Sequence, residues 1–191
     1  MDTIWQLVVG FLLTTVLGGL LGTYLQRRSW NQQNEAQLRE AQRHRAGEVC
    51  QAVSGLLDRR RYRMLRLFYA VEGHTRGAVS AAALDDKLAS YDQVLYEWND
   101  QLNVNLALVE TSFGRLAREQ LERAYATYEA VGAELEDAYR QAVQGSRPGT
   151  LAELGKRLDA LDQLAYDLSL LMMTQLLDGT VGRRAPHPPR P

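Results

Sequence analysis

The residue types that most often carry catalysis or metal binding are scarce in this chain. Its 191 residues include one cysteine and three histidines, Cys50, His44, His74 and His187. A di-iron bundle needs a Glu three residues before a His, and none of these histidines follows a Glu at that distance. The sequence also lacks paired cysteines, a His-Glu-x-x-His pair and a glycine-rich phosphate loop. We therefore expect a protein that is not an enzyme and holds no metal or cofactor, with Cys50 as a buried, inert thiol.

The most distinctive polar cluster is the arginine-rich segment 59–66 (RRRYRMLR). At 100° per residue, Arg59, Arg63 and Arg66 share a polar helix face, whereas Arg60 falls within the apolar stripe of the same helix. A charge at a core position is costly unless it is paired and hydrogen-bonded. Two interpretations follow. Arg60 reaches the rim of the core over its aliphatic stem, or it forms a buried polar lock with Asn105, which lies in the apolar stripe of the facing helix.

Charge is distributed very unevenly along the chain, although its net value is only −1. Residues 25 to 70 hold ten arginines against four acids, and residues 71 to 191 hold twelve basic residues against eighteen acids. Oppositely charged segments of one chain are expected to pack on each other, whereas a surface of one sign would indicate nucleic acid. Arg59, Arg63 and Arg66 are therefore not expected to bind nucleic acid. Only two of the 22 basic residues are lysines, which suggests a GC-rich bacterial genome.

The first apolar segment, residues 4 to 25, has no formal charge. As a helix it would span roughly 33 Å, enough for a hydrocarbon core of about 30 Å. A cleaved signal peptide is the alternative. Such a peptide begins with basic residues and ends at a small-residue cleavage site, and this segment lacks both. Arg27 and Arg28 follow directly, where they can contact anionic lipid, while only Asp2 precedes. The positive-inside rule then predicts a single-pass inner-membrane protein with its N-terminus outside and its C-terminal bundle in the cytoplasm.

Small residues recur every fourth position within this segment, at Gly10, Thr14, Gly18 and Gly22. Such a ridge lets a second helix approach closely in lipid. We expect it to be a helix-association face, for another copy or for a protein partner. The alternative is an ordinary lone anchor, because glycine is common in transmembrane helices.

The remaining sequence predicts long helices. No proline occurs between the anchor and Pro148, and apolar residues recur with helical spacing over 49–71, from 80 or 84 to 113, over 115–144 and from 151 to 177. Glycine-containing segments separate them, and residues 150–153 (TLAE) form a capping box. We therefore predict an all-α protein with an N-terminal transmembrane anchor (1–28), a polar helical stalk (29–48), an up-down bundle of about four long helices (49–177) and a disordered proline-rich tail (178–191).

These features predict a membrane-anchored helical interaction or scaffold protein that assembles with itself or binds a protein partner through helical or coiled-coil contacts. No small-molecule substrate is expected. The alternative function is a signalling or effector component whose bundle controls the membrane helix.

Overall fold

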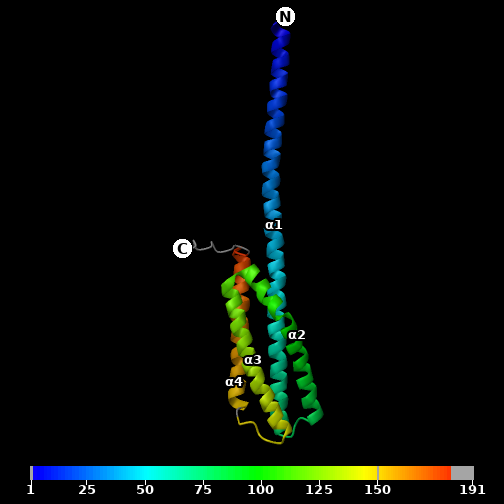
Figure 1. The fold of residues 1–191 in the computed structure, drawn as a ribbon, viewed down its shortest axis with the longest axis vertical. Coiled ribbons are helices and arrows are strands. Elements are labelled where there is room, and N and C mark those ends of the chain that lie inside the picture. Colours follow the sequence, from blue (N-terminus) through cyan, green and yellow to red (C-terminus); the bar gives the residue numbers. More distant parts are fainter. Residues whose placement is uncertain (1, 150, 182–191) are drawn as a thin grey trace. The chain divides into compact units, whose positions relative to one another are not determined.

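The computed structural model describes the backbone of residues 2–149 and 151–181, and the side chains of residue 30, residues 33–149 and residues 151–181. It contains four α-helices, α1 (Asp2–Thr75), α2 (Ala81–Phe113), α3 (Arg115–Val143) and α4 (Leu151–Leu177) (Figure 1). No strand occurs among the described residues. The predicted all-α class is confirmed.

The chain divides into two compact units, Met1–Gln42 and Arg43–Pro191. In the first unit, the described side chains from residue 33 onward are exposed. Arg39 pairs with Glu35 one helical turn earlier, with 3.3 Å between Nη2 and Oε2. This exposure follows from the polar composition of the segment, which has no apolar stripe to bury.

The helices of the second unit end where the sequence supplies terminating residues. Ser80 caps α2, its hydroxyl accepting a hydrogen bond from the backbone N–H of Ala83 at 3.3 Å. Gly114 has a φ of 83° and alone separates α2 from α3. Residues that carry a Cβ atom rarely adopt a positive φ. Glycine at this position therefore allows the chain to reverse direction within a single residue. The capping box predicted for α4 includes Thr150, which lies outside the described residues.

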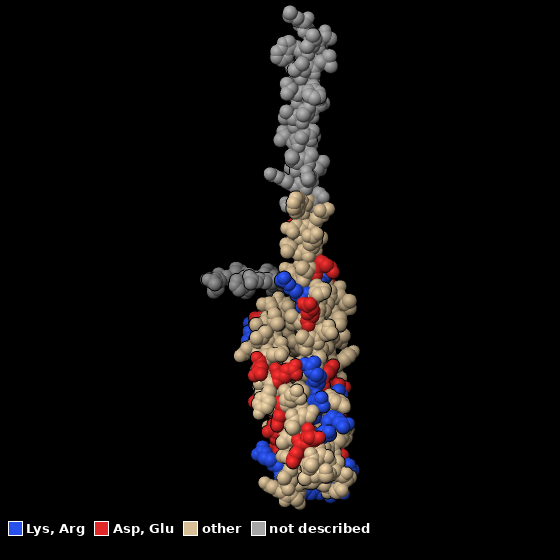
Figure 2. Space-filling view, turned by 90° about the vertical axis from the view of Figure 1, so that its right-hand side faces the viewer, with Lys and Arg blue, Asp and Glu red and all other residues tan. Residues whose placement is uncertain are grey.

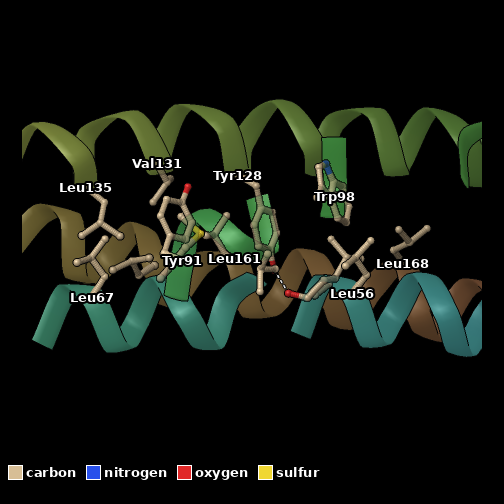
Figure 3. Packing of buried hydrophobic residues seen from close by; sticks show 14 of the residues in the cluster. Leu56, Leu67, Tyr91, Trp98, Tyr128, Val131, Leu135, Leu161 and Leu168 are labelled. Atoms are coloured by element: carbon tan, nitrogen blue, oxygen red, sulfur yellow. Dashed lines mark hydrogen bonds between the residues drawn. The ribbon is translucent and has the colours of Figure 1, made fainter. Parts of the chain in front are cut away.

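In the second unit, the four helices run alternately up and down with short connections (Figure 1). Their apolar stripes meet in one core that includes Leu56, Leu67, Tyr91, Leu135 and Leu161 (Figure 3). The helices expected over 115–144 and up to residue 177 end within one residue of those bounds. The helical spacing of apolar residues was therefore sufficient to predict where these helices of the bundle end.

Helix α3 approaches its neighbours most closely, with Cα atoms of α2 and of α4 within 8 Å of its own. Its buried face carries many small residues, Ala117, Ala124, Gly132, Ala138 and Ala142. Small side chains allow helix axes to come closer because the separation depends on the residues at the contact. The buried residues of α1 in this unit are mostly large, although they include Ala46 and Ala70.

The oppositely charged segments contact each other within the bundle. Arg59 of α1 pairs with Glu97 of α2 at 2.8 Å, and Arg61 pairs with Asp162 of α4 at 3.1 Å. Figure 2 shows basic and acidic side chains interspersed on the face of the bundle turned toward the viewer. These ion pairs are partly exposed, so each contributes little to stability.

Candidate functional site

Arg60 is the one buried charged residue among the described residues, with 1% of its surface exposed. It lies on the core-facing side of α1 between Leu56 and Met64, as the helical periodicity predicted. The side chain therefore does not reach the rim of the core to place its charge in water, so the first of the two interpretations is not what the structure shows.

Three aromatic rings surround the guanidinium of Arg60. Its Cζ atom lies 5.4 Å from the ring centroid of Trp98, 6.0 Å from that of Tyr125 and 5.5 Å from that of Tyr128. Trp98 stacks almost parallel to both tyrosine rings, with interplanar angles of 7° and 14°. A cation over an aromatic face is attracted by the ring quadrupole, by about 2 kcal/mol when water is excluded. The attraction of the rings thus offsets part of the hydration energy that the guanidinium loses on burial.

The hydrogen-bonding capacity of this region is incompletely used. Nε and Nη1 of Arg60 have no protein partner among the described residues, and neither does the indole Nε1 of Trp98. Most buried polar atoms in native proteins are paired, and an unpaired one costs about 1–3 kcal/mol. Arg60 and its surroundings therefore form the least satisfied part of an otherwise apolar core.

Two buried tyrosines stand beside Arg60. Burial raises the pKa of the Tyr91 hydroxyl, and the charge of Arg60 together with a hydrogen bond from it opposes that rise. Burial also raises the pKa of Tyr128, whose hydroxyl donates a long hydrogen bond of 3.5 Å to the carbonyl of Leu57 (Figure 3). Both phenols therefore remain neutral at physiological pH, and neither supplies the anion that would pair with Arg60.

The structure does not join Arg60 to Asn105 by a hydrogen bond. Asn105 is half-buried on α2, seven residues beyond Trp98, which is about 10 Å along a helix. The register of the α1–α2 hairpin sets this separation, because Arg60 lies fifteen residues before the end of α1 and Trp98 seventeen residues after the start of α2. The partners of Arg60 are accordingly Tyr91 and Trp98 of α2 and the two tyrosines of α3.

The aromatic partners were present in the sequence as core residues, but their role was not anticipated. Trp98, Tyr125 and Tyr128 each lie in the apolar stripe of their helix. Tyr125 and Tyr128 are three residues apart and so share a face, which is the signal that could have suggested an aromatic environment for a buried arginine. Whether Arg60 faces these two tyrosines depends on the register of α1 against α3, which the sequence pattern does not specify.

The other arginines of the cluster lie on the surface. Arg59 and Arg61 form the ion pairs described above, and Arg63 and Arg66 are exposed. The guanidinium of Arg63 lies 5.9 Å from the ring centroid of Tyr62, its neighbour in the chain. The polar face expected of Arg59, Arg63 and Arg66 is thus exposed, with Arg59 engaged by Glu97.

The reactive side chains identified in the sequence have ordinary structural surroundings where they are described. His44 lies 3.4 Å from Glu48, and Nδ1 of His74 is 2.8 Å from the carbonyl oxygen of Val79. His187 lies outside the described residues. Burial raises the pKa of the Cys50 thiol, which keeps it in its less reactive protonated form. Among the residues searched, no group of His, Cys, Asp and Glu side chains could hold a metal ion.

The residues of the predicted anchor are outside the part of the chain whose side chains are described. They include the ridge of Gly10, Thr14, Gly18 and Gly22 and the proposed lipid-facing pair Arg27 and Arg28. Among the residues whose side chains are described, no helix contains a stretch long and apolar enough to cross a membrane.

The distinguishing feature of the bundle is therefore a buried arginine held among stacked aromatic rings. Comparison of the chain with protein-family models, with curated proteins and with solved structures found no match.

Proposed function

We propose that this protein is a single-pass protein of a bacterial inner membrane whose cytoplasmic helical bundle assembles with further copies of itself or binds a protein partner. The observation that carries the proposal is the surface of the bundle, where large apolar side chains are exposed on the outer faces of α1 and α4. Exposed apolar clusters on a folded domain are typical of interaction sites.

The sequence of the first segment supports membrane attachment. Residues 4 to 25 carry no charge and are followed by Arg27 and Arg28, a pattern typical of a spanning helix with its basic end in the cytoplasm. The small-residue ridge at Gly10, Thr14, Gly18 and Gly22 would then bring two such helices together in lipid. The function would lie in placing and assembling proteins at the membrane rather than in catalysis.

Light scattering of the full-length protein in detergent tests the assembly half of this proposal. The natural chain is compared with the double variant Gly18→Ile, Gly22→Ile and with a shortened chain that starts at Trp30. We expect an oligomer that the isoleucines dissociate, because branched side chains keep the helix backbones apart. Three monomers would contradict self-assembly and would leave a different protein as the partner of the bundle.

A second function, control of the membrane helix by a conformational change of the bundle, is favoured by the unpaired nitrogens of Arg60. A buried charge without all its hydrogen bonds makes the native packing less stable. The free-energy difference between the native and an alternative packing is then smaller than it would be for a purely apolar core. Replacing Arg60 by Met should then change the oligomeric state or the activity of the protein. A small change in melting temperature alone would exclude this function.

A further inference from the structure

Helix α4 exposes a second apolar stripe, separate from the one it buries. Its members are Tyr166, Leu170, Met173 and Leu177, with exposed fractions of 60%, 50%, 49% and 80%. The residues follow one another at intervals of four, three and four, so at 100° per residue they fall within about 60° of each other. We call these four residues the outer stripe of α4.

The spacing of the outer stripe is that of a coiled-coil seam. Alternating intervals of four and three are what the a and d positions of a heptad repeat produce, and such positions insert between side chains of a facing helix. The core-facing positions of α4 are different residues, including Leu161, Leu168 and Met172. The outer stripe is therefore not a by-product of the bundle core, and its pattern fits one additional helix.

Helix α1 lies beside the outer stripe without covering it. The hydroxyls of Ser54 and Ser169 are 2.8 Å apart and Arg61 pairs with Asp162, which fixes the antiparallel register of α1 and α4. At the level of the outer stripe, α1 carries Gly47 and Gly55, and a Cβ atom at either position would meet nothing within 4 Å. The space beside these two glycines is open to an incoming helix.

The charges that α4 itself contributes to this surface are all negative. Between residues 159 and 178, α4 and the residue after it contain four aspartates and no lysine or arginine, with the acids at Asp159, Asp162, Asp167 and Asp178. Arg61 neutralises Asp162, and the Asp167 carboxylate accepts a hydrogen bond from the Gln163 amide. Flanking charges at a coiled-coil seam select a partner of opposite sign.

We propose that the outer stripe of α4 is the docking surface for a partner protein that offers a basic amphipathic helix, with apolar residues at the same four-three-four spacing and lysine or arginine beside them. The proposal rests on the proposed function, of which it specifies the partner. A second copy would present the same aspartates and no lysine or arginine between residues 159 and 178 of its own α4, so it lacks the opposite charge that this surface favours.

A peptide titration tests this proposal. The full-length protein is reconstituted in phosphatidylcholine nanodiscs, and empty nanodiscs serve as the blank. The probe is a fluorescein-labelled helical peptide with leucines at the four-three-four positions and lysines beside them, and a second peptide carries glutamates in place of the lysines. Fluorescence anisotropy should show saturable binding of the lysine peptide and at least tenfold weaker binding of the glutamate peptide, since like charges across an interface disfavour association.

Variants of the protein distinguish docking from general adhesion. The double variant Leu170→Glu, Met173→Glu should weaken binding of the lysine peptide at least tenfold, because charges enter the centre of the seam. The matched control is Leu116→Glu, which changes a leucine of similar exposure, 55%, on α3 and should leave binding unchanged. Asp167→Arg should reduce the preference for the lysine peptide over the glutamate peptide.

Three results would overturn the proposal. They are the absence of saturable binding, equal binding by the control and the double variant, and an oligomer in light scattering that the Leu170→Glu, Met173→Glu change dissociates, since a second copy would then occupy the stripe. The test of the anchor glycines is separate, so assembly through the membrane helix can succeed when peptide docking fails, and the reverse.

Discussion

Arg60 shows how a charged side chain is accommodated in this bundle without an ion pair. Aromatic faces lie on the guanidinium at 5.4 to 6.0 Å, and two of its nitrogens have no protein partner among the described residues. The attraction of the rings is of the same order, about 1–2 kcal/mol, as the cost of one unpaired donor. Arg60 therefore contributes volume to the core, while its charge gives little net stability.

The first prediction separates volume from charge at Arg60. Arg60→Met keeps a long side chain and removes the charge, so the free energy of unfolding should stay equal or rise by about 1–3 kcal/mol. Arg60→Ala removes the volume and should lower it by about 2–5 kcal/mol. Urea unfolding followed by circular dichroism measures both. If Arg60→Met proves as destabilising as Arg60→Ala, the charge itself is needed for packing.

The second prediction concerns the buried phenols. The pKa of Tyr128 is higher in the folded protein than in the unfolded chain because the ring is buried. Below pH 10 both states keep the proton, and above it the unfolded chain loses the proton first. Stability should therefore fall as pH rises, by about 1 kcal/mol for this tyrosine between pH 10 and pH 11.

Comparison of Tyr128→Phe with the natural chain isolates that contribution. The variant should lose less stability between pH 10 and pH 11 in urea titrations, because phenylalanine has no proton to release. Tyr166→Phe is the control, since Tyr166 is exposed on α4, and it should follow the natural chain. A decline in Tyr128→Phe as steep as in the natural chain would show that the phenol does not carry the effect.

At the scale of the elements, the close approach of α2 and α3 depends on Gly132. A Cβ atom at this position would overlap the hydroxyl of Tyr91, whereas one at Gly55 on α1 would meet nothing within 4 Å. Gly132 therefore provides the space that the Tyr91 side chain occupies against α3. Both glycines lie inside helices, where glycine itself is unfavourable.

The third prediction uses the two glycines as a matched pair. Gly132→Ala should lower the free energy of unfolding by about 1–3 kcal/mol through overpacking. Gly55→Ala should raise it by about 0.5–1 kcal/mol through helix propensity. Adding Tyr91→Phe to Gly132→Ala removes the overlapping oxygen and should restore part of the loss. Destabilisation of the same size at both glycines, measured in urea, would point to backbone effects instead of the contact with Tyr91.

The periodicity of apolar residues was sufficient to predict which residues face the core, but not which residues contact each other across helices. The spacing of apolar residues placed Arg60 in the core and Trp98 in the stripe of α2 correctly. It could not choose between Trp98 and Asn105 as the residue opposite Arg60, because both lie in the same stripe at different heights. That height depends on the conformation of the five residues between Thr75 and Ala81, which the spacing of apolar residues does not specify.

At the scale of the whole molecule, the fourth prediction concerns membrane topology. If residues 4 to 25 span the membrane with Arg27 and Arg28 in the cytoplasm, a fluorescent protein fused to the C-terminus should be bright and alkaline phosphatase fused there should be inactive. The chain should also stay in the membrane fraction after an alkaline wash. The basic residues set this orientation through the positive-inside rule.

Charge reversal supplies the control for that prediction. Asp2→Arg combined with Arg27→Glu and Arg28→Glu should shift part of the population to the opposite topology, with phosphatase activity appearing. Recovery of the natural chain in the soluble fraction would contradict anchoring, and an active phosphatase fusion on the natural chain would contradict the predicted orientation.

The sequence by itself determined the helical class, the helices of the bundle and the core position of Arg60, because apolar periodicity and glycine-rich connections are local properties of the chain. Tertiary structure alone decided what surrounds Arg60, that Gly132 makes room for Tyr91, and that a second stripe of α4 remains exposed. These features depend on the height and rotation of one helix against another. Both are fixed by the fit of side chains from distant parts of the sequence, which a local pattern does not contain.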